Sequence, residues 1–249
     1  MKDFVDGLRL TRRFAADFGH SNWWGAAQHG PALAGLAAPP SVARGRERVY
    51  IAASHTPDCA MPWGSSPAVD NTIVWSGTRF VHDQYHLSRQ AKLDQFVAPY
   101  VADGGALSLD VCYQRRPEGQ SLNCGRCEKC LRTAIGLLAA GVVPQAVGVP
   151  LNLEAIRIAK RALSDGIWHT TETEKFRWTN IQSSISPDVQ QLNVPSEVKD
   201  FMAWLRATDL PIATPRPGIV SSLLSPFRYL AELLLRPLPY SVKRAVRGG

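Results

Sequence analysis

The stretch Asp110–Gly141, DVCYQRRPEGQSLNCGRCEKCLRTAIGLLAAG, holds four of the five cysteines of the chain. They are spaced C-x11-C-x2-C-x2-C, at Cys112, Cys124, Cys127 and Cys130. Thiolates that recur every third residue, where a loop turns into a helix, can converge on one point, and a thiolate from a preceding strand can complete a tetrahedron. The spacing therefore predicts a zinc knuckle in which these four cysteines bind one structural zinc ion.

Other interpretations of the four cysteines stay open. The run C-x2-C-x2-C also begins the bacterial ferredoxin motif, but that motif continues with Cys-Pro, where this chain has Ala134 and Ile135. Reduced cysteines without a metal are the second alternative. Disulfides fit badly, because nothing at the N-terminus resembles a secretory signal and a chain of this size can build a core.

Local signals around the cysteines predict a strand and a helix. The run 106–109 has the character of a strand that ends just before Cys112. Asn123 is a candidate N-cap, and Gly141 is a candidate C-terminal stop. Between them lies an apolar stripe at helical spacing, formed by Leu131, Ile135 and Leu138.

The chain upstream of the cysteines predicts α/β structure. Residues 49–52 (VYIA) have the composition of a buried parallel strand, and a short helix is expected at 29–37, followed by a loop at 38–46. Residues 51–77 are expected to form a long polar loop, and a helix is expected at 88–100. Because α/β proteins bind ligands where parallel strands end, the long loop is the expected ligand site.

Polar side chains in this loop supply the candidate catalytic groups, which are Cys59, His55 and Asp58. Cys59 is either a nucleophile beside a histidine or a small buried thiol. Three residues of the following helix are candidates for binding phosphate or the charge of an adenylate: Ser88, Arg89 and Lys92. A plain solvent-facing helix is the alternative for this segment.

The order of these motifs resembles the C-terminal half of 7-cyano-7-deazaguanine synthase-like proteins, members of the PP-loop (N-type ATP pyrophosphatase) superfamily. The resemblance rests on Pro57-Asp58-Cys59, on the lysine-bearing helix with Lys92, and on the four cysteines. It is closer to a branch with the pattern SSHT, PWGS, VHD and NCGRCEKCLRT. Between residues 22 and 145 this chain has Ser54-His55-Thr56 of the first motif and the other three motifs in full.

The resemblance implies an ATP-dependent ligase in which a small-molecule carboxylate is adenylated and a nitrogen nucleophile then displaces AMP. It implies a set of residues that bind the substrate or the nucleotide: Ser54, His55, Asp70, Ser88, Arg89 and Lys92. The superfamily's S-G-G-x-D-S pyrophosphate loop does not occur in this sequence. We therefore expect ATP and Mg²⁺ to bind only if an N-terminal half is supplied, in a chain that is truncated, degenerate or one half of a split protein.

A second hypothesis is a non-catalytic, zinc-stabilised binding module. Under either hypothesis, the chain is expected to associate with a complementing N-terminal chain or to form a homo-oligomer.

Two domains are predicted: residues 1–150 as the α/β half including the knuckle, and residues 151–249 as a helical extension. Helices are expected at 151–164 and 195–207, whereas 170–186 is a polar segment with packing anchors at Phe176, Trp178 and Ile181. Residues 210–217 are a proline-rich linker. The basic, leucine-rich tail at 218–249 is predicted either to pack on the parent domain or to lie on a membrane surface.

Composition limits the class of protein. The chain has 249 residues, 45% hydrophobic and 20% charged, which is ordinary for a globular protein. No run of 18 apolar residues occurs in the sequence, so a membrane-spanning helix is not expected. We expect a cytoplasmic location. The net charge of +7 suits an anionic ligand, and nucleic acid is not an expected partner.

Overall fold

The computed structural model of the chain describes residues 24–61, 63–112, 121–188 and 194–211. All of these belong to the first of two units, Met1–Ile212. The tail predicted at 218–249 and most of the predicted linker lie outside the described residues. Within the described ranges, no helix has both the length and the hydropathy needed to cross a bilayer.

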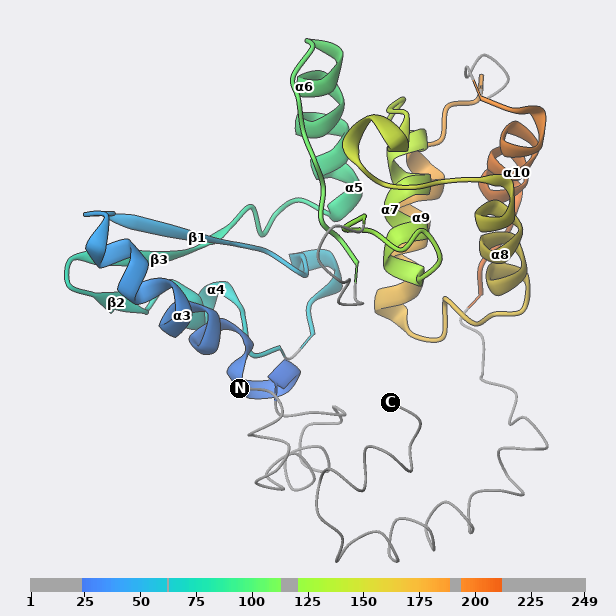
Figure 1. Cartoon of the computed structure of the whole chain (residues 1–249). Helices are drawn as coiled ribbons and strands as arrows, with labels where there is room; N and C mark the ends of the chain where they lie inside the picture. Colours follow the sequence, from blue (N-terminus) through green and yellow to red (C-terminus); the bar gives the residue numbers. More distant parts are fainter. Residues whose placement is uncertain (1–23, 62, 113–120, 189–193, 212–249) are drawn as a thin grey trace, which may run out of the picture. The chain divides into compact units, whose positions relative to one another are not determined.

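A small mixed sheet forms the strand part of the fold (Figure 1). It contains β1 (Arg48–Ala52), β2 (Val74–Trp75) and β3 (Thr78–Asp83), in the order β1-β3-β2. β1 and β3 are parallel, and β2 is antiparallel to β3. The predicted parallel strand at 49–52 is therefore confirmed, but it is buried on one face only: Ile51 is buried, whereas Tyr50 is 57% exposed.

The segment predicted as one long loop has structure of its own. It contains a 3₁₀ turn, Pro57–Cys59, the short helix α4 (Pro67–Asp70), and β2. β2 and β3 are joined by a two-residue turn in which Ser76 and Gly77 both have positive φ, 43° and 80°. Positive φ at both positions is the conformation that matches the twist of a β-hairpin, which explains the glycine.

α3 (His29–Ala43) covers one face of the sheet, where its Ala34 packs with Ile51 and Phe80. One π-helical turn, Trp24–Gln28, precedes this helix. The predicted end of this helix at residue 37 is wrong, because the helix continues through Pro39 and Pro40. The prolines leave the carbonyls of residues 35 and 36 without helical partners, and both residues are exposed to water.

The predicted helix at 88–100 is confirmed as one helical run made of α5 (Arg89–Lys92), a π-helical segment (Leu93–Val97) and α6 (Ala98–Ala102). Ser88 caps it, because its Oγ accepts a hydrogen bond of 3.0 Å from the N–H of Ala91. Gly104 ends it with a φ of 83°.

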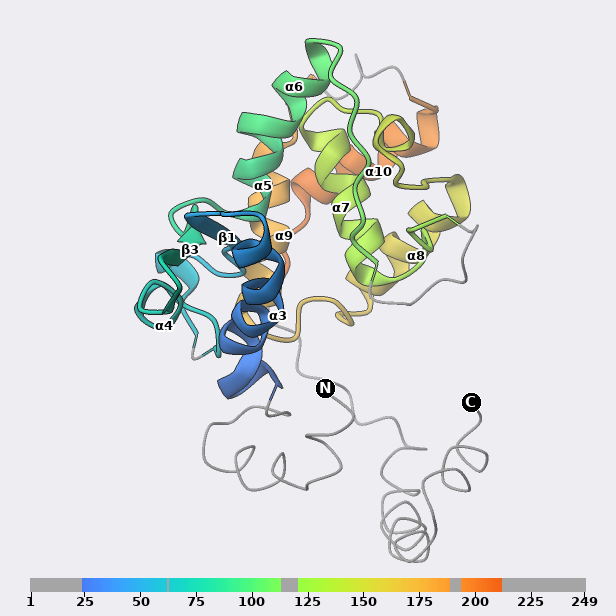
Figure 2. The same cartoon turned by 60° about the vertical axis from the view of Figure 1, so that its left-hand side comes forward.

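Four further helices pack around one core (Figure 2): α7 (Glu128–Ala139), α8 (Leu153–Ser164), α9 (Glu172–Ser184) and α10 (Ser196–Ala207). Leu131 and Ile135 of α7 lie in the same buried cluster as Trp178 and Phe201, so this core spans the domain division predicted at residue 150. α9 was predicted only as a polar segment. Its start has a capping box between Thr171 and Glu174, a local helix signal that its irregular apolar pattern masks.

A second core cluster lies on the other side of α7, where Leu137 packs with Val147 and Val149 near a short 3₁₀ turn (Pro144–Val147). The predicted strand at 106–109 joins this cluster as an extended segment outside the sheet. The N–H of Leu109 donates a hydrogen bond to the carbonyl of Val147, at 2.9 Å. No regular series of such bonds to a neighbouring strand is found for 106–109 among the described residues, so this segment does not form a strand of a sheet.

Candidate functional site

The four predicted metal ligands converge. The sulfur atoms of Cys112, Cys124, Cys127 and Cys130 all lie within 4.8 Å of one another. The Sγ atoms of Cys112 and Cys127 are 3.9 Å apart, as are those of Cys124 and Cys130. A tetrahedral ion with metal–sulfur bonds of about 2.3 Å requires sulfurs about 3.8 Å apart. The four thiols therefore have the separation of a metal site.

Local backbone geometry aims these sulfurs. Gly125 has a φ of 66°, which turns the chain back between the second and third cysteines. The N–H groups of Arg126 and Cys127 then point at the sulfur of Cys124, at 3.4 and 3.3 Å. α7 begins directly after Cys127, so Cys130 lies in its first turn and is fully buried.

Asn123 has a different role from the predicted N-cap of α7, because the position that precedes the helix is Cys127. The buried amide of Asn123 donates hydrogen bonds to the carbonyls of Leu109, at 2.6 Å, and Gly148, at 2.9 Å. Its oxygen accepts one from the N–H of Val111, at 2.9 Å. Asn123 directly precedes Cys124, so it fixes the segment that carries Cys112 against the loop that carries Cys124 and Cys127.

The local environment shifts the pKa values of the Cys124 and Cys130 thiols in opposite directions. Burial raises the pKa of Cys124. Hydrogen bonds from the backbone N–H groups of Arg126 and Cys127, together with those from the thiols of Cys112 and Cys127, outweigh this and bring the pKa to about 6. For Cys130, burial is the dominant effect and raises the pKa. A thiolate held by N–H donors is the form that binds metals, so Cys124 is prepared for this role.

A cavity of about 380 Å³ lies at the carboxyl end of β1. Six residues predicted from the sequence line it, three from the loop after β1 and three from the start of the α5 helix: Ser54, His55, Cys59, Ser88, Arg89 and Lys92. The structure therefore brings together two sets of residues that are thirty positions apart in the sequence. Their meeting point is the end of a parallel strand, where α/β proteins bind ligands.

The Lys and Arg residues that line the cavity give it a positive charge. Arg89 and Lys92 are joined there by Arg132 of α7 and Arg177 of α9, and among the described residues no Asp or Glu lines it. Arg132 forms an ion pair with Glu128 one turn away. Burial lowers the pKa of Lys92; the nearby Asp83 opposes this, and the charge of Arg89 adds to it. The cavity is therefore suited to an anion.

Arg132, Arg177 and Asn180 were missed as cavity residues. Arg177 and Asn180 lie three residues apart on α9, so they share a face, but only the packing of α9 against α5 and α7 brings that face to the cavity.

Two predicted residues do not line this cavity. Asp58 is exposed in the Pro57–Cys59 turn. Asp70 is fully buried, where its Oδ2 accepts a hydrogen bond of 2.6 Å from Ser65 and lies 2.7 Å from Nδ1 of His82. These contacts give Asp70 a role in holding α4 to β3, and they leave its Oδ2 committed to protein partners.

Cys59 is half-buried in the cavity wall. Its thiol donates a weak hydrogen bond to the Oγ1 of Thr173, at 3.7 Å, which links the loop after β1 to α9. His55 lies on the same wall, with its ring 5.7 Å from that of Trp63. Both candidates for nucleophile and base therefore line the cavity.

The chain matches no protein-family model, no curated protein and no solved structure. The resemblance to the PP-loop superfamily thus rests on the motifs in the sequence.

Proposed function

We propose that the chain is a zinc-stabilised protein that binds a small anionic substrate, with the chemistry of 7-cyano-7-deazaguanine synthase-like enzymes. In that chemistry a carboxylate attacks the α-phosphorus of ATP and releases pyrophosphate, and a nitrogen nucleophile then displaces AMP. The observation that supports this most is the convergence of the predicted residues on one cation-lined cavity, at the carboxyl end of β1.

Zinc would be held by Cys112, Cys124, Cys127 and Cys130. Four protein thiolates leave no open coordination position, so the ion would fix the fold and take no part in the reaction. Two features support zinc: the mutual sulfur distances, within 4.8 Å, and the N–H donors that favour a thiolate at Cys124.

The walls of the cavity define the class of substrate. Arg89 and Lys92 supply positive charge for a carboxylate, while Phe176 and Leu93 supply apolar surface for the body of the ligand. Ser54 and Ser88 add hydroxyl groups for orientation. A volume of about 380 Å³ suits a small aromatic or heterocyclic carboxylate.

A non-catalytic binding module is the second candidate, favoured by the lack of the S-G-G-x-D-S loop in the sequence. Backbone N–H groups of that loop hold pyrophosphate in the superfamily, so ATP and Mg²⁺ would need residues from a complementing N-terminal chain. In this case the cavity would bind the same anions without turnover.

Calorimetric titration of the full, zinc-loaded chain tests the proposal with two probes, indole-3-carboxylate and Mg-ATP. We expect the carboxylate to bind and Arg89→Gln or Lys92→Gln to weaken it at least tenfold, as expected for a charge-assisted contact. Arg206→Gln, at an exposed position on α10, removes the same charge as a control. Carboxylate binding that these cavity variants leave unchanged would refute the proposal, and Mg-ATP binding would favour the enzyme over the binding module.

A further inference from the structure

The face of the sheet opposite α3 carries an unusual set of exposed side chains. Along β1 the outward positions are Arg48, Tyr50 and Ala52. Along β3 they are the exposed Arg79 and the half-buried Val81 and Asp83, with Asp83 at the carboxyl end of the strand, away from Arg79. α3 covers the other face, through Ala34 against Ile51 and Phe80. The outward side chains of the two parallel strands therefore form one surface, which we call the arginine face.

Two arginines lie directly opposite each other on the arginine face. Arg48 of β1 is the register partner of Arg79 of β3, so their side chains leave the sheet side by side. Like charges in directly opposed positions destabilise a sheet. A sequence that places them there gains from an anion that bridges both side chains.

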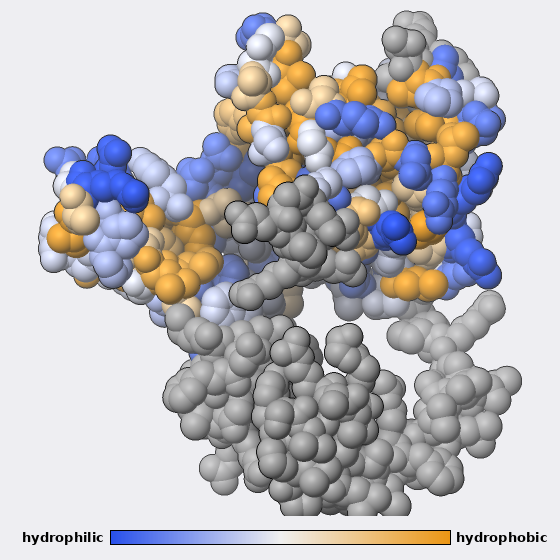
Figure 3. Space-filling model, in the orientation of Figure 1, coloured by the Kyte–Doolittle hydropathy of each residue, from blue (hydrophilic) through white to orange (hydrophobic). Residues whose placement is uncertain are grey.

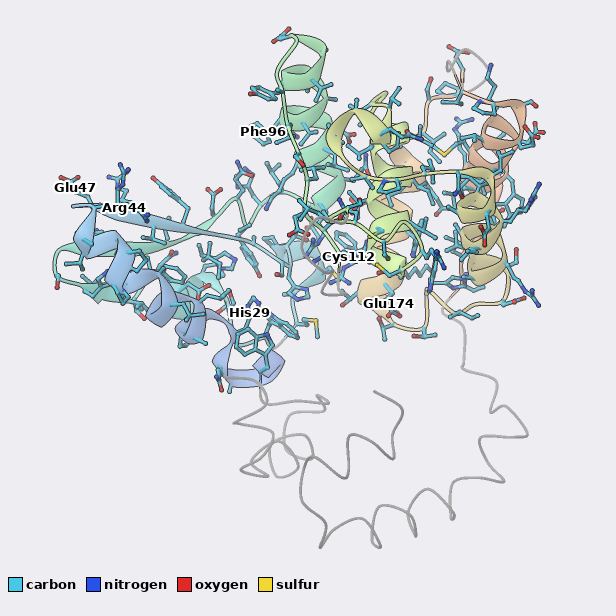
Figure 4. The ribbon with its side chains drawn as sticks, viewed as in Figure 1. His29, Arg44, Glu47, Phe96, Cys112 and Glu174 are labelled. Carbon is cyan, nitrogen blue, oxygen red and sulfur yellow. The ribbon has the colours of Figure 1, made fainter. Side chains whose placement is uncertain are left out.

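The surrounding residues add to this positive charge. An open hollow of about 680 Å³ at the amino ends of β1 and β3 is lined by Arg46, Arg48 and Arg79, and Glu47 is the one acidic residue that lines it among the described residues. Within the described part of the chain, neither Arg46 nor Arg79 forms an ion pair. Figure 3 shows hydrophilic residues gathered at this end of the sheet, where Figure 4 labels Arg44 and Glu47.

An aromatic ring lies beside the arginines. Tyr50 is two residues after Arg48 on the same face and is 57% exposed. A hydrogen bond to the Tyr50 side chain is the main effect that raises the pKa of Arg48, so the two groups are in contact. An exposed aromatic ring next to guanidinium groups is the arrangement on which unpaired bases stack while cations hold the phosphates.

We propose that the arginine face binds single-stranded nucleic acid, with Arg46, Arg48 and Arg79 on successive phosphates and Tyr50 stacked on a base. The charge of the hollow favours a polyanion, and the exposed ring favours a nucleic acid over an acidic protein. This inference reverses the expectation from the sequence that nucleic acid is not a partner. Arg48 and Arg79 are 31 positions apart in the sequence, so their pairing is not visible there.

Fluorescence anisotropy with a labelled twelve-nucleotide oligouridine RNA tests the proposal on the full, zinc-loaded chain. The main variant is Arg48→Gln/Arg79→Gln, and the control is Arg157→Gln/Arg206→Gln, which removes two exposed arginines from α8 and α10. Loss of two phosphate contacts should reduce the slope of log K against log salt by about 1.4, since each contact to a single strand contributes about 0.7. The control should leave the slope unchanged.

The aromatic contact has its own test. Tyr50→Ala should weaken RNA binding about tenfold at fixed salt, whereas Tyr50→Phe keeps the stacking surface and should retain most of the affinity. Circular dichroism confirms that each variant is folded. Three results would overturn the proposal: no RNA binding by the wild-type chain at low salt, equal losses in the two double variants, or Arg48/Arg79-dependent binding to phosphatidylserine vesicles without binding to RNA.

Discussion

Gly30 and Asp70 are packed so closely that the glycine cannot be replaced without moving the carboxylate. A Cβ at Gly30 would overlap with Oδ1 of Asp70 and would lie 2.9 Å from the carbonyl oxygen of Gly64. The N–H of Gly30 donates a hydrogen bond to that same carbonyl, at 2.6 Å. The start of α3 is therefore locked against the buried Asp70.

This contact predicts that alanine substitution changes the stability of the protein in opposite directions at two glycines of α3. Gly30→Ala should lower the free energy of unfolding by about 3 kcal/mol, because Asp70 is fully buried and has no space to yield. Gly35→Ala is the matched control: nothing lies within 4 Å of its Cβ, so it should stabilise α3 by about 1 kcal/mol. Urea unfolding followed by circular dichroism measures both, and equal effects would contradict the close contact.

Asn123 offers a second prediction, since its side chain satisfies three backbone groups while 1% exposed. Asn123→Ala should cost about 3 kcal/mol of stability, because those groups lose their partners in a buried setting. It should also speed zinc release to a colorimetric chelator, since Cys112 is no longer held in place. Gln145→Ala, which removes one exposed hydrogen bond to Leu151, should change stability by less than about 0.5 kcal/mol.

The sequence predicts best those features that local chemistry determines. The helix expected at 88–100 is present, and its ends have local causes: Ser88 caps its start and Gly104 ends it. β3 was missed because two of its three buried side chains, Thr78 and His82, are polar, which hides the alternation of a strand. The role of Asn123 was misassigned. The sequence does not distinguish an asparagine that caps the following helix from one whose side chain binds the backbone of distant segments.

The candidate site also has parts that local sequence predicts and parts that depend on how distant elements pack. The cysteine cluster was predictable because three of its ligands are neighbours in one turn and their spacing determines their geometry. The part of the cavity formed by the loop after β1 was also predictable, since Ser54 lies two residues after the end of that strand. The position of Arg177 in the cavity was not predictable, because it depends on how α9 packs against α5, and no local pattern specifies that packing.

Metal analysis gives a third prediction. The purified chain should carry one zinc ion, and Cys124→Ser should lose it and melt at a lower temperature, because binding of a structural zinc contributes directly to folding. Cys59→Ser is the control: it replaces the one cysteine outside the cluster and should retain the zinc. Iron with visible absorbance in place of zinc would favour a cluster, and zinc retained by Cys124→Ser would contradict the assigned ligands.

The last prediction concerns Lys92 and pH. Burial, with the charge of Arg89 in addition, lowers the pKa of Lys92 below its usual 10.5. A carboxylate ligand favours the protonated ammonium, so affinity should be constant near neutral pH and should fall as pH rises through this lowered pKa.

Titrations with indole-3-carboxylate between pH 7 and 10.5 measure this fall. Lys92→Arg should remove it, because a guanidinium stays protonated over the whole range. Arg89→Gln should bind more weakly but move the fall to higher pH, since it removes one cause of the lowered pKa. A fall in affinity that persists unchanged in Lys92→Arg would show that another group titrates and would exclude Lys92 as the contact to the carboxylate.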